Sequence, residues 1–270
     1  MICAGMICAG IDVGSRTIKV VLFDANGHGV VAAAAADQGI EQEALAMQLL
    51  ERVLKENHIG REDVRAVVAT GYGRKLISIA DDTITEITCQ AWGVSSAVPN
   101  ARTIIDIGGQ DSQLVRLNGR GAVSDFAMND RCAAGTGRFL EVVATRLGVR
   151  LADLGKLVGK SRTPAFISNM CVVFAETEII GLLASGVASE DIVAGVQSSI
   201  ATRVAAMVGQ NVTPPVVFTG GVALVPGMKD SLQEALRETV MVAPHPQTTG
   251  ALGAAILAAR RLDAGDTPMP

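Results

Sequence analysis

The sequence predicts an α/β protein built from two similar halves. Short strand-like apolar segments alternate with longer amphipathic helical segments, which is typical of this class. A strand followed by a glycine-containing turn occurs twice, at Asp12-Val13-Gly14-Ser15 and at Asp106-Ile107-Gly108-Gly109. The two turns hold equivalent places, so we expect a duplication of architecture rather than of sequence. We place a first half at residues 6–100 and a second at 101–270.

The first half is expected to contain four strands and one helix. The pentapeptide Met-Ile-Cys-Ala-Gly occurs twice at the start, so we assign no role to Cys3. The helix at 41–57 carries leucines and a valine along one side. The last strand ends at the turn Thr70-Gly71-Tyr72-Gly73-Arg74. The expected strands cover residues 8–13, 18–23, 30–35 and 64–69.

The second half repeats the strand pattern and adds more helices. Apolar residues at helical spacing begin at Gly137 and stop at Gly148. A later strand at 216–219 runs directly into Gly220-Gly221. The other expected strands are 103–107, 112–117 and 122–127, and the other expected helices are 151–158, 171–184, 189–209, 226–238 and 248–261.

Composition narrows the function classes. Hydrophobic residues make up 49% but aromatic residues only 3%, so Ala, Val, Ile and Leu should form the core. The net charge of −4 and the lack of a basic stripe argue against a nucleic-acid partner. The apolar start has no preceding basic residue and is interrupted by Asp12, so we predict neither a signal peptide nor a membrane span. Five cysteines, an odd number, favour a reduced cytoplasmic setting over a disulfide framework.

The two hairpins have the chemistry of a polyphosphate site. Glycine lets backbone N–H groups approach phosphate oxygens, and a hydroxyl or an ammonium group adds further contacts. An aspartate at the strand end would reach Mg²⁺ through water, because Mg²⁺ prefers oxygen ligands and keeps part of its hydration shell. One such hairpin is an ordinary turn, but two in equivalent places would hold nucleotide phosphates from both sides. The residues expected to contact phosphate or metal are Asp12, Gly14, Ser15, Lys19, Asp106, Gly108 and Gly109.

A third glycine turn, at Gly220-Gly221, would let a flat base or ribose approach the backbone. Alone it would be read as a simple strand-to-helix turn. The chain has no Gly-x4-Gly-Lys-Ser/Thr sequence, which excludes a P-loop. The Gly135-Thr136-Gly137 stretch does not complete a dinucleotide-binding fingerprint.

Cys132 lies just ahead of a predicted helix start. Gly135 and Gly137 would allow a tight turn with uncovered N–H groups, and a thiolate is stabilised beside such groups and a positive helix end. This would suit a metal ligand or a reactive thiol. The alternative is a small buried hydrophobic residue, which is the usual role of a free cysteine. We assign that alternative to Cys8 and Cys89.

Three segments carry a resemblance to a known family. They are Asp106-Ile107-Gly108-Gly109-Gln110-Asp111, the run from Asn129 to Leu140, and the run from Ile167 to Glu176. Together with the two hairpins and the Gly220-Gly221 turn, they resemble the iron–sulfur ATPase family within the actin-like ATPase superfamily. This family contains activators of 2-hydroxyacyl-CoA dehydratases and ATPase subunits of benzoyl-CoA reductases. The resemblance implies two ribonuclease-H-like halves of the actin-like ATPase fold.

The resemblance also implies the cofactors and the partners. Cys132 and Cys171 match the family's cluster ligands, and a [4Fe–4S] cluster takes four thiolates, so a homodimer would share one cluster. Asp106 and Gln110 would be catalytic, Gly135, Thr136 and Gly137 would contact the cofactor, and ATP, ADP and Mg²⁺ would occupy the phosphate site. A ferredoxin or flavodoxin would supply an electron, and a CoA-thioester dehydratase or reductase would accept it. The family thus implies ATP-driven electron donation, with no nucleic acid and no membrane involved.

Two other classes of protein remain open from the sequence. A sugar or acid kinase of the same fold would need neither cysteine nor iron. A redox sensor or scaffold would carry the cysteines without turning over ATP. Within the family, the activators of dehydratases and the ATPase subunits of benzoyl-CoA reductases differ by partner, and a single short chain favours the activator.

Overall fold

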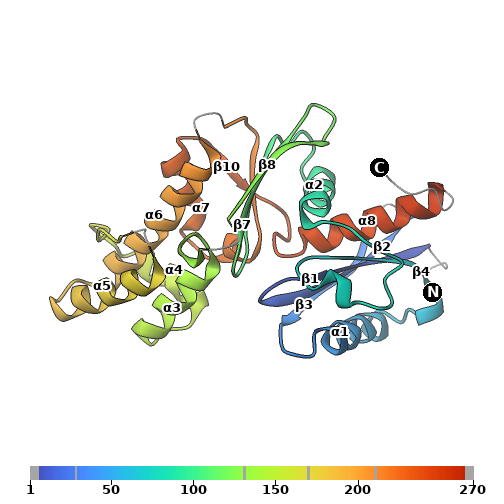
Figure 1. The fold of residues 1–270 in the computed structure, drawn as a ribbon, viewed down its shortest axis with the longest axis horizontal. Helices are drawn as coiled ribbons and strands as arrows, with labels where there is room; N and C mark the ends of the chain where they lie inside the picture. Colours follow the sequence, from blue (N-terminus) through green and yellow to red (C-terminus); the bar gives the residue numbers. More distant parts are fainter. Residues whose placement is uncertain (1–5, 28, 130–131, 169–170, 210–211, 265–270) are drawn as a thin grey trace. The chain divides into compact units, whose positions relative to one another are not determined.

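Two five-stranded sheets form the framework of the protein (Figure 1). The computed structural model describes residues 6–27, 29–129, 132–168, 171–209 and 212–264. In spatial order, the first sheet comprises β3 (Gly29–Asp37), β2 (Thr17–Asp24), β1 (Ile7–Val13), β4 (Val64–Thr70) and β5 (Asp82–Thr83). Its counterpart comprises β8 (Val123–Asn129), β7 (Ser112–Leu117), β6 (Thr103–Ile107), β9 (Val216–Thr219) and β10 (Val240–Val242).

The strands of both sheets pair in the same sense. β1 is antiparallel to β2 and parallel to β4, just as β6 is antiparallel to β7 and parallel to β9. Each strand of one sheet therefore has a counterpart in the other. The predicted duplication of architecture is confirmed.

The helices divide between two compact units. The first unit consists of Met1–Pro99, Gly121–Val123 and Gln247–Pro270, and the second of Asn100–Arg120 and Ser124–Pro246. Helices α1 (Gln42–Glu56), α2 (Glu86–Ala97) and α8 (Thr249–Ala264) belong to the first. Helices α3 (Gly137–Leu147), α4 (Leu154–Val158), α5 (Val172–Ala184), α6 (Ser189–Val208) and α7 (Met228–Leu236) belong to the second.

The first sheet is covered on both faces. Alternate side chains of a strand point to opposite faces, so Ile11 and Val13 of β1 pack in one cluster while Cys8 packs in another. α1 contributes its buried leucines to the Ile11 cluster, and α8 contributes its alanines to the Cys8 cluster. Figure 1 shows α1 on one side of this sheet and α8 on the other.

Close packing determines where α8 belongs. A Cβ on Gly10 of β1 would overlap the carbonyl oxygen of Ala251, and a Cβ on Gly253 would overlap that of Cys89 in α2. Glycine and alanine therefore let α8 lie against the first sheet. α8 belongs to the first unit because its alanine face packs there, whereas the sequence division into 6–100 and 101–270 placed these residues in the second half.

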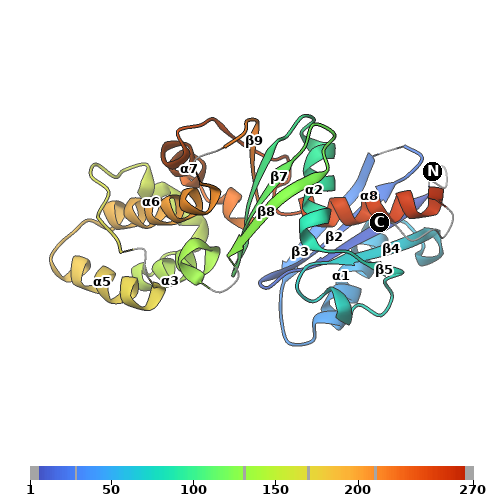
Figure 2. The ribbon, with the colours of Figure 1, turned by 45° about the horizontal axis from the view of Figure 1, so that its top comes forward.

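The second unit has one large apolar cluster, which includes residues of β6, α3, α6 and α7. Phe139 and Leu140 of α3 are fully buried in it together with Phe218 of β9. Figure 2 shows α3 and α5 side by side in this unit, and the two helices are in contact. The start of α3, which carries the predicted site, is thus fixed by the core.

Most predicted elements are present, but three were not predicted. α2 carries no clear amphipathic pattern and packs against α8, which lies between it and the sheet. β5 and β10 are only two and three residues long. The predicted tail after residue 264 lies outside the described residues. Among the described residues, no helix combines the length and the apolar character needed to cross a bilayer.

Candidate functional site

The first hairpin brings a carboxylate and an ammonium group together. Asp12 lies opposite Lys19 in the β1–β2 register, and Lys19 Nζ is 3.0 Å from Asp12 Oδ2. The turn is closed by a hydrogen bond from Gly14 N to Thr17 O (3.1 Å). Gln38, which sequence reasoning missed, donates from Nε2 to Gly14 O (2.8 Å) and so fixes the turn from the end of β3. The structure therefore places Asp12, Gly14, Ser15 and Lys19 in one hairpin.

The second hairpin has the same geometry, with an amide in place of the cation. Gln113 of β7 lies opposite Asp106, in the place that Lys19 holds in the first hairpin. The turn is closed by a hydrogen bond from Gly108 N to Asp111 O (3.0 Å), and Gln113 donates to Asp111 Oδ2 (3.0 Å). Asp106 is 9% exposed, whereas Gln110 is exposed at the tip of the turn. The two hairpins are therefore alike in backbone and different in charge.

β4, which is parallel to β1, and β9, which is parallel to β6, both end in a threonine that is followed by a glycine. Thr70 is in register with Asp12, and Thr219 is in register with Asp106. Gly71 and Gly220 follow with φ values of +84° and +87°, which favour glycine. A Cβ on Gly71 would strike the Asp12 carboxylate, and a Cβ on Gly220 would strike that of Asp106. The repeated Thr-Gly pair was the available sequence signal that both turns belong to the site.

The Cys132 segment is joined directly to the second hairpin. Gly137 N donates to Gly108 O (2.9 Å), and Arg138 N donates to Gly109 O (2.8 Å). The N–H group of Gly137, which we expected to be uncovered, is thus used by the hairpin. A Cβ on Gly137 would lie 3.0 Å from Gly108 O, so close approach requires glycine there. The start of α3 and the phosphate hairpin therefore form one connected piece.

Cys132 and Cys171 hold similar local positions. Cys132 caps a short 3-10 turn (Ala133–Gly135), and its carbonyl oxygen accepts a hydrogen bond from Asn129 Nδ2 (2.9 Å). Cys171 caps α5, and Ala175 N donates to its carbonyl oxygen (2.9 Å). Both cysteines are partly exposed and free.

The other two described cysteines are different. Cys8 and Cys89 have no exposed surface and pack in the cluster between the first sheet and α8. Burial raises the pKa of the Cys89 thiol to about 12. The prediction that these two cysteines are core residues is confirmed.

Mg²⁺ and an iron–sulfur cluster place different demands on these residues. Within the described residues, no three His, Cys, Asp or Glu side chains lie together as a metal-binding group. Mg²⁺ carried on a nucleotide needs only one or two carboxylates besides phosphate and water, which suits Asp12 and Asp106. A [4Fe–4S] cluster needs four thiolates, and one chain offers the two partly exposed cysteines of the second unit. The donor set fits half of such a cluster.

The two equivalent sheets, each with an aspartate-ended strand and a tight hairpin, define an actin-like nucleotide-binding protein. A ROK hexokinase from Thermus thermophilus shares this fold with a TM-score of 0.54 at 16% identity, over 96% of this chain and all of that chain. The chain belongs to the BadF/BadG/BcrA/BcrD ATPase family, whose sequence model matches residues 9–258.

Relatives in this family cover nearly the whole chain. The activator of lactoyl-CoA dehydratase from Anaerotignum propionicum is 44% identical over 94% of this chain and 97% of its own length. A benzoyl-CoA reductase component from Thauera aromatica is 33% identical over 94% of each chain. The structure of the activator of the 2-hydroxyisocaproyl-CoA dehydratase from Clostridium difficile with bound ADPNP has a TM-score of 0.91 at 39% identity, covering 98% of this chain and 100% of that chain.

Proposed function

We propose that the protein is an ATP-hydrolysing electron donor that activates a 2-hydroxyacyl-CoA dehydratase. The observation that carries this proposal is the pair of hydrogen bonds from the start of α3 to the carbonyl oxygens of Gly108 and Gly109. These bonds connect a phosphate-type hairpin to the segment that follows Cys132. A movement of this hairpin when ATP is hydrolysed would therefore move the start of α3, which follows the Cys132 turn. Such a movement is what coupling ATP hydrolysis to electron donation requires.

The nucleotide would be held by residues of both hairpins and by a glycine turn. Gly14, Ser15 and Lys19 would contact phosphate from the first unit, with Asp12 holding the hydrated Mg²⁺. Gly108 and Gly109 would do so from the second unit. Asp106 would orient the metal or the attacking water, assisted by Gln110, since correct positioning is a large part of catalysis of such reactions. The Gly220-Gly221 turn, which carries no side chain and in which Gly220 has a positive φ, would face the adenosine.

Cys132 and Cys171 would hold a [4Fe–4S] cluster together with the same two cysteines of a second copy. When bound, the cluster would store and pass on one low-potential electron. The Cys132 turn and the N-terminus of α5 would direct backbone N–H groups toward this anionic group. Gly135 and Thr136 would shape the turn, because the Thr136 hydroxyl donates to Ala133 O (2.9 Å).

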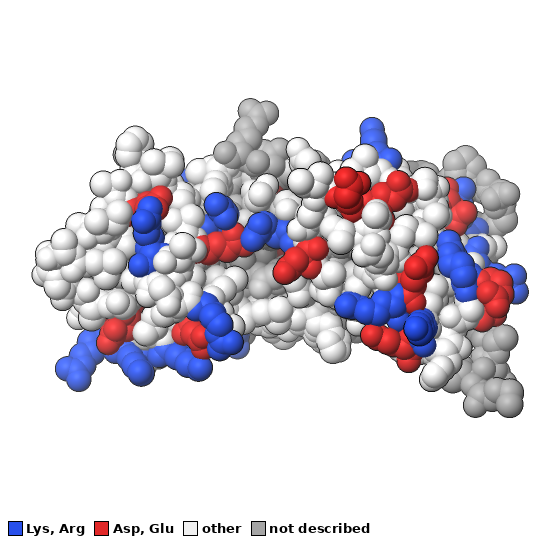
Figure 3. Space-filling model, turned by 90° about the horizontal axis from the view of Figure 1, so that it is seen from below, with Lys and Arg blue, Asp and Glu red and all other residues white. Residues whose placement is uncertain are grey.

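An apolar face of α5 supports the homodimer. Val173, Phe174 and Ile180 are 66%, 65% and 47% exposed, at helical spacing on one side of the helix that Cys171 caps. In Figure 3 the far-left end of the second unit, where α5 lies, is mostly white, with few charged side chains. An exposed apolar face of this kind is typical of a protein–protein interface, and we assign it to the second copy.

The names of the relatives support the choice of partner. The activator of lactoyl-CoA dehydratase is 44% identical, and the benzoyl-CoA reductase component is 33% identical. We therefore favour a dehydratase over a reductase as the electron acceptor. A ferredoxin or flavodoxin in the cytoplasm would supply the electron.

The test is anaerobic purification of the full chain with measurement of iron, sulfide, mass and ATP turnover. We expect a brown dimer with about four irons and four sulfides per two chains, since one shared cluster needs all four thiolates. A colourless, iron-free protein would contradict the proposal and favour a kinase of the same fold. Iron without ATP turnover would favour a redox sensor or scaffold.

A further inference from the structure

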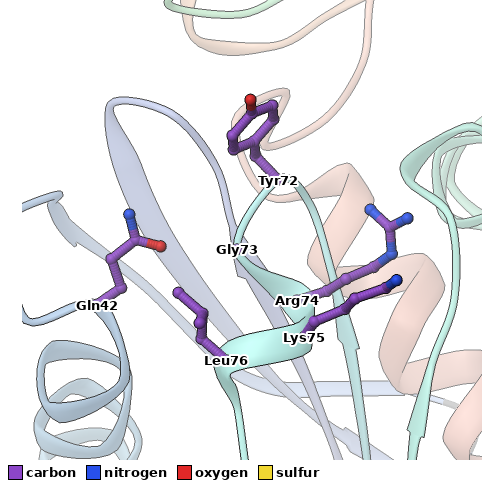
Figure 4. A pocket seen from close by; sticks show the side chains of 6 residues that line it. All are labelled: Gln42, Tyr72, Gly73, Arg74, Lys75 and Leu76. Carbon is purple, nitrogen blue, oxygen red and sulfur yellow. The ribbon is translucent and has the colours of Figure 1, made fainter.

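The turn after β4 borders a cavity of about 350 Å³ in the first unit. The cavity is lined by Gln42 of α1 and by residues 72–76 of the turn. Figure 4 shows Arg74 and Lys75 extending from one side of the turn, Gln42 and Leu76 on the other, and Tyr72 at its tip. Tyr72 is 86% exposed. Tyr72, Arg74 and Lys75 of the first unit therefore have no role in the function proposed above.

This turn is built against the phosphate hairpin. Gly73 N donates to Val13 O (2.9 Å), next to Asp12 in β1. Gly71 leaves no room for a Cβ beside the Asp12 carboxylate. The turn therefore has the same relation to Asp12 that the Gly220 turn has to Asp106. Since Asp12 and the first hairpin belong to the proposed nucleotide site, the turn that packs against them in the same unit is placed to contact the same ligand.

Arg74 is the side chain of the turn best suited to that contact. Its guanidinium donates to Gly71 O (2.9 Å), and Gly71 also lies against the Asp12 carboxylate. Among the described residues, Arg74 forms no ion pair, although it is only partly exposed. A guanidinium has five N–H donors, and within the described part of the chain only the bond to Gly71 O engages them.

Lys19 does not make Arg74 redundant. Its ammonium group is 3.0 Å from Asp12 and is partly neutralised by that carboxylate. A terminal phosphate placed near Asp12 would meet a negative charge, and an additional cation would offset the repulsion. Arginine suits this task because its planar fork can bind two phosphate oxygens at once.

We propose that Arg74 binds the terminal phosphate of ATP and thereby distinguishes ATP from ADP. This rests on the proposed function, because it requires a nucleotide in the site. Lys75, on the same side of the turn but exposed and without an ion pair within the described residues, serves as a matched control.

The test is calorimetric titration of the anaerobically purified full chain with ADP and with ADPNP, for wild type, Arg74→Gln and Lys75→Gln. Loss of charge-assisted hydrogen bonds should weaken ADPNP binding to Arg74→Gln about tenfold to a hundredfold, with ADP affinity unchanged. Lys75→Gln should bind both nucleotides as wild type does. Thermal unfolding of each variant shows whether it is folded.

Two results would overturn the assignment of Arg74. One is wild-type affinity of Arg74→Gln for ADPNP. The other is equal weakening of ADP and ADPNP, which would indicate a general disturbance of the hairpin. Failure of the wild-type protein to bind either nucleotide would instead contradict the proposed function itself.

Discussion

Arg146 of α3 forms an ion pair with Glu176 of α5. The pair joins the helix that follows the Cys132 segment to the helix that Cys171 caps. Both side chains are partly exposed, so the pair should contribute little to stability. Glu178 has a different role, because its carboxylate accepts a hydrogen bond from Ser168 N (2.7 Å) and fixes the chain ahead of Cys171.

Removal of these two glutamates should therefore have unequal effects. Glu178→Ala leaves a partly buried N–H group without its charged partner, and we expect a loss of about 1–3 kcal/mol in the free energy of unfolding. Glu176→Ala should cost less than about 1 kcal/mol. Urea denaturation under anaerobic conditions measures both. Equal losses in the two variants would contradict the assigned roles.

Substitution of the cysteines should separate ligands from core residues. Cys132→Ser and Cys171→Ser each remove two of the four thiolates in the proposed dimer, so we expect most of the iron to be lost and the dimer to loosen. Because Cys89 lies in the core, the Cys89→Ser variant should retain the iron. Iron analysis together with gel filtration measures both effects. Full iron content in both ligand variants would refute the cluster assignment.

The partly exposed and the buried cysteines should also differ in their rate of alkylation. Burial holds the pKa of Cys89 at about 12, so its thiolate is scarce at pH 8. After removal of iron, iodoacetamide at pH 8 should label Cys132 and Cys171 and leave Cys8 and Cys89 unmodified until the protein unfolds, as read from peptide masses. The contribution of Cys89 to stability is fully present below its unfolded pKa of about 8.5. Since the folded pKa is raised, that contribution declines as the pH rises above this value.

Asp106 should be required for ATP turnover and dispensable for the cluster. Asp106→Asn keeps the size of the side chain but removes the charge that would orient the metal or water, and we expect turnover to fall about a hundredfold or more. Asp153→Asn is the control, since that carboxylate in the same unit is paired with Arg150 and Lys156. Wild-type turnover in Asp106→Asn, measured by phosphate release, would exclude the assigned role.

The hairpins could be predicted from the sequence because a strand-ending aspartate and a glycine turn are local signals. The register that sets Lys19 opposite Asp12 follows from a two-residue-period strand and a tight turn. The cysteine segments were found through a resemblance, since the reactivity of a thiol depends on burial that no local pattern reports. Cys89 is fully buried, whereas Cys132 is partly exposed.

Other features depend on contacts between distant segments. Gln38, just after β3, reaches Gly14 in the β1–β2 turn. α8 packs on β1 more than 200 residues away in the chain. The hydrogen bonds from Gly137 and Arg138 to the second hairpin likewise join separate stretches. In the sequence, the two expected strands 112–117 and 122–127 separate that hairpin from Cys132. The direct bonds connect the hairpin to the start of α3 without passing through these strands.

That direct connection gives the last prediction, which concerns coupling. A ligand shifts a protein between two arrangements only by its different affinity for them. ATP and ADP differ in the terminal phosphate, so a hairpin that contacts this phosphate would hold different positions with the two nucleotides. Because Gly108 and Gly109 accept hydrogen bonds from the start of α3, the Cys132 segment would follow the hairpin. The proposed cluster would then be more exposed to a partner with ATP than with ADP.

The measurement is the rate at which an iron chelator removes iron in the presence of ADP or of ADPNP. We expect faster removal with ADPNP in the wild-type protein, together with a different midpoint potential, because burial and hydrogen bonding around the sulfurs set that potential. Gly137→Ala would place a Cβ 3.0 Å from Gly108 O and should reduce the difference between the nucleotides. Gly159→Ala, just after α4, would place a Cβ 3.8 Å from Gly155 O, an ordinary contact, and should preserve the difference. Equal chelation rates and equal potentials with the two nucleotides in the wild-type protein would exclude the coupling, because hairpin and cysteine would then move independently despite their hydrogen bonds.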